Sequence, residues 1–168
     1  AADEFEGLPR IYALALELLR TSAGRLDAQR LSRFIAAVQS VTPLTIGELW
    51  AWPSALKIAL IEHLRVGADV LVATRAHRRA ADRVAAAYER DAPAAEKWPE
   101  RIHPAFVTRL LHRAREYGEG ASTLRDHLIA MLETRGETIE DAIRAEGRNQ
   151  AIEQASMANL IGSLRLMS

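Results

Sequence analysis

The stretch from Pro53 to about Glu89 constrains the fold most, because within it Gly67 is the only helix-breaking residue after Pro53. Alanine, leucine and arginine, which favour helices, are common throughout it. An apolar stripe follows the helical period along it, at Leu56, Leu60, Leu64, Leu71, Val84 and Tyr88. The pattern predicts one long helix, or two stacked helices bent near Gly67.

Two helices are predicted before this stretch. The first begins at Pro9, whose fixed φ suits a first helical position, and ends at Ala23 and Gly24. Asp27 is a suitable N-cap for the second, which ends before Pro43. The short connection between them predicts an antiparallel hairpin.

A short helix is predicted next, because Thr45 and Glu48 have the spacing of a capping box. The helix contains Leu49 and Trp50. Pro53 is expected to start the following helix, so that two helices meet at a proline corner.

Proline and glycine also punctuate the C-terminal half. Residues 91–103 resemble a linker, Pro104 opens a helix, and Gly118 and Gly120 end it. Ser122 is the expected N-cap of a further helix, which Gly136 closes, and Thr138 caps the last. No segment alternates as a half-buried strand would. We therefore expect an all-α, multi-helix bundle of about six or seven helices with one long central helix, in a single domain 1–168 with a candidate subdivision at 91–103.

Composition narrows the classes of function. Lys plus Arg and Asp plus Glu number 22 each, so bulk charge does not favour nucleic acid or anionic lipid. The absence of cysteine excludes disulfides and thiolate chemistry and fits a reducing compartment. No apolar run approaches the roughly 20 residues that cross a bilayer. These features favour a cytoplasmic location.

No catalytic, metal or cofactor motif is complete. The five histidines are spread over different predicted elements, and His112 with Glu116 supplies only two metal ligands. Gly118, Glu119 and Gly120 lack the Gly-Lys-Ser/Thr ending of a phosphate loop, so a helix break is the better interpretation. We expect no catalytic residue, no metal site and no cofactor in this segment.

Charged residues mostly predict solvated helix faces. Glu62 has Arg65 three positions away, and Asp82 has Arg78 four positions away, which is typical of a solvated helical face. Arg75, Arg79 and Arg83 would share one face of a helix and are the candidates for binding phosphate groups of nucleic acid or lipid. Because aromatic residues are not interleaved with them, an exposed or domain-facing surface is the preferred interpretation.

Two sets of side chains are candidates for contact with other molecules. Trp50, Trp52 and Trp98 could stack on sugar rings, although a core or corner role is the more usual one. On the last helix, small residues adjoin polar ones, which predicts close packing with hydrogen bonds between helices, or an interface with another domain. The candidates for a domain interface are Gln150, Gln154, Ser156, Asn159 and Ser163.

Three stretches carry a resemblance to a known family. They are residues 8–15 (LPRIYALA), residues 43–51 (PLTIGELWA) with 61–65 (IEHLR), and a set on the last helix: Glu146, Arg148, Gln150, Ala151, Gln154, Ser156, Asn159, Ile161, Ser163, Leu164 and Arg165. Together they resemble the N-terminal region of bacterial cyclic β-1,2-glucan synthases, which are large membrane-bound glycosyltransferases. The chain departs from that pattern at His63, where the family commonly has asparagine, and at Gly147, where a bulkier polar residue is usual.

The resemblance implies a fragment of a larger multidomain protein that transfers glucose from UDP-glucose into a β-1,2-linked chain. No catalytic residue carries over, because the nucleotide- and metal-binding aspartates of such transferases would lie after Ser168. It implies a non-catalytic module that scaffolds or positions the glycosyltransferase on the cytoplasmic side of the bacterial inner membrane. Its expected partners are other domains of the same polypeptide, with glucan as a candidate ligand and no nucleic acid.

Overall fold

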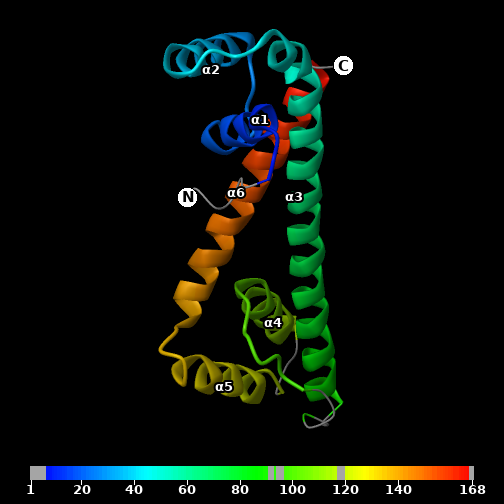
Figure 1. The fold of residues 1–168 in the computed structure, drawn as a ribbon. Helices are drawn as coiled ribbons and strands as arrows, with labels where there is room; N and C mark the ends of the chain where they lie inside the picture. The colour runs from blue at the N-terminus through cyan, green and yellow to red at the C-terminus, as the bar shows by residue number, and fades with distance from the viewer. Residues whose placement is uncertain (1–6, 91–92, 94–96, 117–119, 167–168) are drawn as a thin grey trace. The chain divides into compact units, whose positions relative to one another are not determined.

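The computed structural model describes residues 7–90, 93, 97–116 and 120–166, and the regular elements of these residues are six α-helices (Figure 1). The predicted all-α fold is confirmed, as is its long helix. In chain order the helices are α1 (Arg10–Thr21), α2 (Ala28–Val41), α3 (Ile46–Glu89), α4 (Pro104–Glu116), α5 (Gly120–Glu133) and α6 (Ile139–Leu166).

The chain divides into two compact units, each with its own core. The first unit comprises Ala1–Ala68 with Ile152–Ser168, and the second comprises Asp69–Ala151. α1 and α2 belong to the first unit and α4 and α5 to the second, while α3 and α6 contribute residues to both. The single domain predicted for 1–168, with its candidate subdivision at 91–103, stays a prediction.

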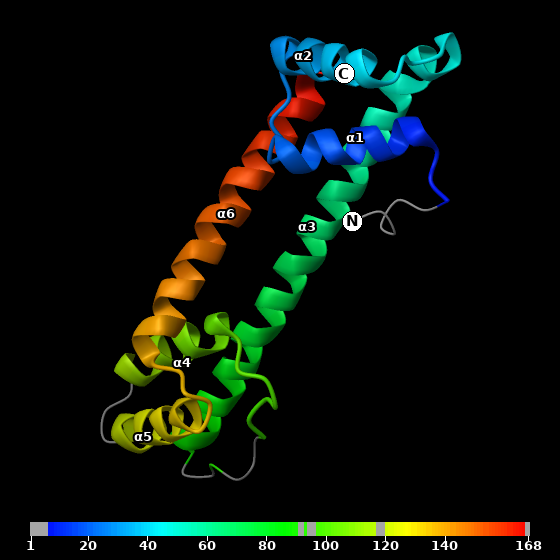
Figure 2. The same ribbon diagram turned by 60° about the vertical axis from the view of Figure 1, so that its left-hand side comes forward.

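Local backbone chemistry sets the ends of α1 and α2. Pro9 is the N-cap of α1 and not its first helical residue, so the predicted start is wrong by one position. Ala23 and Gly24, with φ of 50° and 75°, follow α1 and turn the chain away as predicted. Asp27 caps α2 as predicted, because its carboxylate accepts a hydrogen bond from the Arg30 N–H at 2.8 Å. The two helices run in opposite directions, as in the predicted hairpin (Figure 2).

α3 begins with the predicted capping box. The Glu48 N–H donates to Thr45 Oγ1 at 3.2 Å, and the Thr45 N–H donates to Glu48 Oε2 at 2.7 Å. The predicted corner at Pro53 is wrong, because α3 continues through this residue. A proline removes one backbone hydrogen bond and bends a helix without having to end it, and α3 bends near its N-terminal end in Figure 2. Gly67 does not interrupt the helix either.

Most helices of the second unit begin and end at the positions predicted from the sequence. α4 starts at Pro104, and Thr138 caps α6 by accepting a hydrogen bond from the Asp141 N–H at 3.1 Å. Gly136, with φ of 67°, follows α5 as predicted. The predicted start of α5 at Ser122 is wrong, since Gly120 already begins that helix and does not end α4. Gly118 and much of the predicted linker (91–92 and 94–96) lie outside the described residues.

The first core consists mainly of leucine and alanine side chains from α1, α3 and α6. Leu19, Leu60 and Leu160 are among its fully buried members. α2 has no fully buried residue and instead packs a partly buried stripe, including Phe34 and Ile35, against this core. A Cβ on Gly67 would stand 3.2 Å from the Met157 sulfur, so a small residue suits the approach of these two segments.

The second core is built around Phe106 of α4. It packs with Val84 of α3 and Leu128 of α5, and all three are buried. Trp98 is partly buried against this core and meets the Phe106 ring edge-on, with 5.7 Å between ring centroids. Burial against the same cluster raises the pKa of Tyr88.

Candidate functional site

The polar strip of α6 binds the turn between α1 and α2. Ser163 is 2% exposed. Its Oγ accepts a hydrogen bond from the Leu26 N–H at 2.9 Å and donates one to the Gly24 carbonyl at 2.7 Å. Asn159 Nδ2 donates to the Ala23 carbonyl at 3.2 Å. The sequence predicted hydrogen bonds between helices, whereas those of Ser163 and Asn159 go to the turn after α1, where they satisfy backbone groups.

Gly24 is required at this turn for two reasons. Its φ of +75° is unfavourable for any residue with a side chain. A Cβ at this position would also lie 2.9 Å from Leu160 Cδ2, which is closer than side chains pack. The turn therefore fits against α6 only because residue 24 is a glycine.

The other three interface candidates of α6 have different surroundings. Ser156 is half-buried and Gln154 is exposed, both in the first unit. Gln150 belongs to the second unit and donates a hydrogen bond to Glu146 Oε1 at 2.8 Å. Contact of these residues, or of Asn159 and Ser163, with another domain stays a prediction.

Glu146 is a buried carboxylate that the sequence analysis quoted only as part of the family resemblance. Its side chain is 4% exposed and pairs with Arg78 of α3 at 2.8 Å. Arg78 thus forms an ion pair with another helix, although its spacing from Asp82 on α3 is typical of a solvated helical face. The helical spacing of Arg78 and Asp82 was a weak signal, because each side chain instead reaches a partner on another helix.

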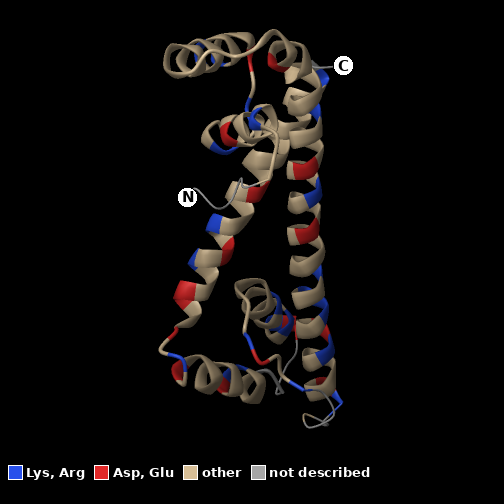
Figure 3. Cartoon of the chain, viewed as in Figure 1, with Lys and Arg blue, Asp and Glu red and all other residues tan. Residues whose placement is uncertain are grey.

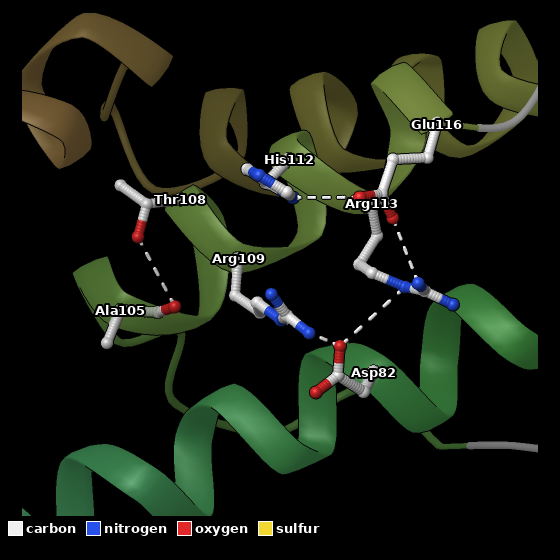
Figure 4. A network of polar contacts seen from close by, with 7 residues as sticks. All are labelled: Asp82, Ala105, Thr108, Arg109, His112, Arg113 and Glu116. Atoms are coloured by element: carbon white, nitrogen blue, oxygen red, sulfur yellow. Dashed lines mark hydrogen bonds and ion pairs between the residues drawn. The ribbon is translucent and has the colours of Figure 1, made fainter.

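Asp82 belongs to a network of charged side chains between α3 and α4 (Figure 4). Its Oδ1 accepts a hydrogen bond from Arg109 Nε at 2.7 Å and lies 3.7 Å from Arg113 Nε. Arg113 also pairs with Glu116 at 2.9 Å, and His112 lies 3.6 Å from the same carboxylate. Each cation of the network thus has an acidic neighbour, which is the pattern of a structural ion-pair network.

Arg75, Arg79 and Arg83, the predicted anion-binding row, are exposed on α3. The spacing places them on one helical face, as predicted, but phosphate binding by this row stays a prediction. Glu62 and Arg65 pair along α3 at 2.7 Å and are exposed, as expected of a solvated helical face.

Within the described part of the chain, no three His, Asp or Glu side chains gather as potential metal ligands. None of the helices in that part is long and apolar enough to cross a membrane.

The three tryptophans have three different environments. Trp52 is 8% exposed and stacks on Phe34 with 6.1 Å between ring centroids, which is the core role that the sequence analysis preferred. Trp98 is half-buried against the second core. Trp50, by contrast, is 82% exposed. Sugar stacking stays a prediction, and only Trp50 presents a largely open ring.

Trp50 belongs to an exposed apolar surface at the end of α2 and the start of α3, which we call the apolar corner and define as Val41, Ile46, Leu49 and Trp50. Ile46, Leu49 and Trp50 share one side of α3 at helical spacing, and Val41 is the last residue of α2. Val41 is 85% exposed and Ile46 is 76% exposed. Such a concentration of exposed apolar side chains marks an interaction surface.

Charge is scarce around the apolar corner. Between Phe34 and Ile61 the sequence has only two charged residues, Glu48 and Lys57. In Figure 3 the ribbon of α2 carries a little blue, since the helix contains Arg30 and Arg33, and the ribbon from the end of α2 into α3 is mostly tan. The long run without charge was the sequence signal that could have predicted this surface.

Polar contacts from Arg10 and Glu48 fix the connection between α2 and α3 beside the apolar corner. Arg10 of α1 donates a hydrogen bond to the Thr42 carbonyl at 2.9 Å and lies 3.5 Å from Glu48 Oε1. The hydrogen bond from the Thr45 N–H lowers the pKa of Glu48 and keeps its carboxylate charged. The connection between α2 and α3 is therefore fixed by its backbone, while its apolar side chains face outward.

The chain is similar to the cyclic β-(1,2)-glucan synthase NdvB of Rhizobium meliloti (strain 1021), with 30% identity over 172 residues. The similarity covers 94% of this chain, so the resemblance noted in the sequence is confirmed, but the chain spans only 6% of the length of that synthase. No protein-family model matches the chain. No solved structure matches it.

Proposed function

We propose that the chain is a non-catalytic docking module of a cyclic β-1,2-glucan synthase, which scaffolds or positions the glycosyltransferase through the apolar corner. The observation that carries this proposal is the exposure of Val41, Ile46 and Trp50, beside a connection between α2 and α3 that Arg10 and the capping box hydrogen-bond. A surface of this kind loses unfavourable contact with water when a partner covers it.

The proposed partner is another part of the same polypeptide. A synthase like NdvB has most of its length outside the region that matches this chain, so covering surfaces are available within one molecule. The scarcity of charge around the apolar corner fits an apolar partner and disfavours a polyanion there. On this proposal, synthesis from UDP-glucose takes place elsewhere in the polypeptide, at the cytoplasmic side of the membrane.

The test replaces apolar corner residues in the full-length synthase. A triple variant, Val41→Ser, Ile46→Ser and Trp50→Ser, is expected to lower both the amount of synthase assembled in the membrane and the yield of glucan. The matched control replaces exposed apolar residues elsewhere, Val72→Ser and Ile152→Ser, which are 64% and 67% exposed. Normal assembly and synthesis in the triple variant would overturn the proposal, and so would an equal loss in the control.

Deleting the whole segment separates scaffolding from a direct part in the reaction. Scaffolding predicts that assembly is lost while the isolated catalytic domain still makes glucan. Unchanged assembly and synthesis after the deletion would contradict any supporting role.

The exposure of Trp50 favours a second candidate, in which this ring stacks on the growing glucan. Titration with β-1,2-glucan should then change tryptophan fluorescence, and Trp50→Ala should abolish the change while Trp50→Phe retains binding. Trp52 is buried and serves as the internal reference in the same spectra. The absence of any change at millimolar sugar would rule this candidate out.

A further inference from the structure

An open cleft of about 530 Å³ lies among α4, α5 and the start of α6, wholly within the second unit. Leu111, Ile139 and Ile143 supply apolar side chains to its wall. Arg115 of α4, Arg125 of α5 and Glu140 of α6 supply charged ones. The volume is in the range of sites that hold small molecules, and the mixture of apolar wall and few charges is typical of them.

Neither arginine of the cleft, Arg115 or Arg125, has a hydrogen-bond or ion-pair partner among the residues that the structure describes. Their neighbours on α4 differ, because Arg109 and Arg113 both pair with Asp82. Both arginines are exposed, and a guanidinium group can bind a carboxylate or phosphate group through two N–H donors at once.

Acidic side chains limit how much negative charge the cleft accepts. Glu140 lines the cleft together with the two arginines, which leaves one net positive charge. A smaller neighbouring cleft of about 250 Å³ shares Arg125 and Glu140 and adds Glu133 and Glu137. Negative charge therefore collects on that side, and the Arg115 side is the more favourable place for an anion.

We propose that this cleft binds an amphipathic ligand with a single negative charge. The anionic group is held by Arg115 and Arg125, and an apolar chain lies along Leu111, Ile139 and Ile143. The site is separate from the apolar corner and from the Arg75, Arg79 and Arg83 row, so it does not depend on the docking function proposed above. A free carboxylate and the phosphodiester of a short-chain lipid share this chemistry.

The test follows the methyl NMR signals of Ile139 and Ile143 while ligands are added to the chain. Octanoate and dihexanoyl phosphatidylglycerol, both below their micelle concentrations, are the two anionic probes, and the one that binds more tightly identifies the source of the charge. Octanol, which lacks the charge, and acetate, which lacks the chain, should each bind at least about tenfold more weakly than octanoate.

Charge variants give the decisive comparison. Arg115→Gln and Arg125→Gln should each weaken the binding of the preferred anion about tenfold, whereas Glu140→Gln should strengthen it severalfold. A gain of affinity cannot come from misfolding, so the Glu140→Gln variant keeps the test valid if an arginine variant unfolds. Arg148→Gln changes an exposed arginine outside the cleft and should leave binding unchanged. The proposal fails if neither anion moves the isoleucine signals, if octanol binds as tightly as octanoate, or if all four variants bind alike.

Discussion

The two units differ in most of the polar contacts that join segments distant in the sequence. In the first, Arg10, Ser163 and Asn159 form hydrogen bonds with backbone groups of the connections that follow α1 and α2. In the second, side chains pair with side chains across helices, as Arg78 does with Glu146 and Arg109 with Asp82.

The difference determines what each surface can bind. In the first unit, Arg10 and Glu48 are the charged residues that contact the connection beside the apolar corner, and the side chains of the corner itself are apolar. The second unit carries ion pairs between helices and a cleft lined by Arg115 and Arg125, which have no partner among the described residues. We infer that the first unit suits an apolar partner and the second an anionic ligand.

The largest effect is expected at the turn of the first unit. Gly24→Ala should lower the free energy of unfolding by about 3 kcal/mol, because it combines an unfavourable φ with a clash against Leu160. Gly136→Ala in the second unit is the matched control, since its φ is also positive but no atom lies within 4 Å of the added Cβ. It should cost only about 1 kcal/mol in the same urea titration. Equal losses would show that the contact with α6 does not constrain the turn.

A smaller effect should come from the buried ion pair of the second unit. Arg78→Ala leaves the carboxylate of Glu146, whose side chain is 4% exposed, with only Gln150 as a partner. We expect a loss of about 2 kcal/mol in the free energy of unfolding. Arg109→Ala should cost less than about 1 kcal/mol, because Asp82 is 39% exposed and water can replace the arginine. If chemical denaturation shows that Arg109→Ala costs more stability than Arg78→Ala, the burial of the Glu146 carboxylate does not determine the strength of these ion pairs.

Ser163→Ala should have the next effect, about 1.5 kcal/mol, because it leaves the buried Leu26 N–H without an acceptor. Hydrogen exchange at that N–H should become faster. Asn159→Ala removes a bond to an exposed carbonyl and should cost about 0.5 kcal/mol. If the two variants lose the same stability, the hydrogen bond to the buried Leu26 N–H is not the reason that Ser163 stabilises the fold.

The smallest effect concerns pH. Hydrogen bonds from the Thr45 N–H and hydroxyl lower the pKa of Glu48 from 4.5 in the folded chain. A lowered folded pKa gives a stabilisation that is present above pH 4.5 and is lost as the pH falls through the folded pKa. Glu48→Gln should therefore lower the melting temperature more at pH 6 than at pH 3. An equal decrease at both values would mean that the charge of Glu48 does not contribute.

The sequence predicted the helices well where one residue determines the backbone. Asp27, Thr138 and Gly136 mark helix ends by their own hydrogen bonds or φ, and all three were identified. The predicted helix boundary at Pro53 was wrong because the surrounding helix tolerates the loss of one hydrogen bond. The prediction that Gly120 ends α4 was wrong because a glycine is compatible with either end of a helix.

The candidate sites were harder to predict from the sequence. The pair of Arg78 and Glu146 joins residues far apart in the chain, and helical spacing reports only on neighbours within one helix. The exposure of Trp50 and the burial of Trp52 depend on which face of α3 packs against the core. The sequence alone does not distinguish these two neighbouring tryptophans. The apolar corner became visible only when burial was known.

Hydroxyl-radical footprinting of the full-length synthase tests the docking role most directly, with Trp50 and Trp52 compared in the same molecule. If another part of the polypeptide covers the apolar corner, Trp50 should be oxidised about as slowly as the buried Trp52, despite the open position of its ring in this segment. The double variant Val41→Ser and Ile46→Ser, which keeps the tryptophan, should restore fast oxidation of Trp50. Rapid oxidation of Trp50 in the unmodified synthase, well above that of Trp52, would contradict the proposed function.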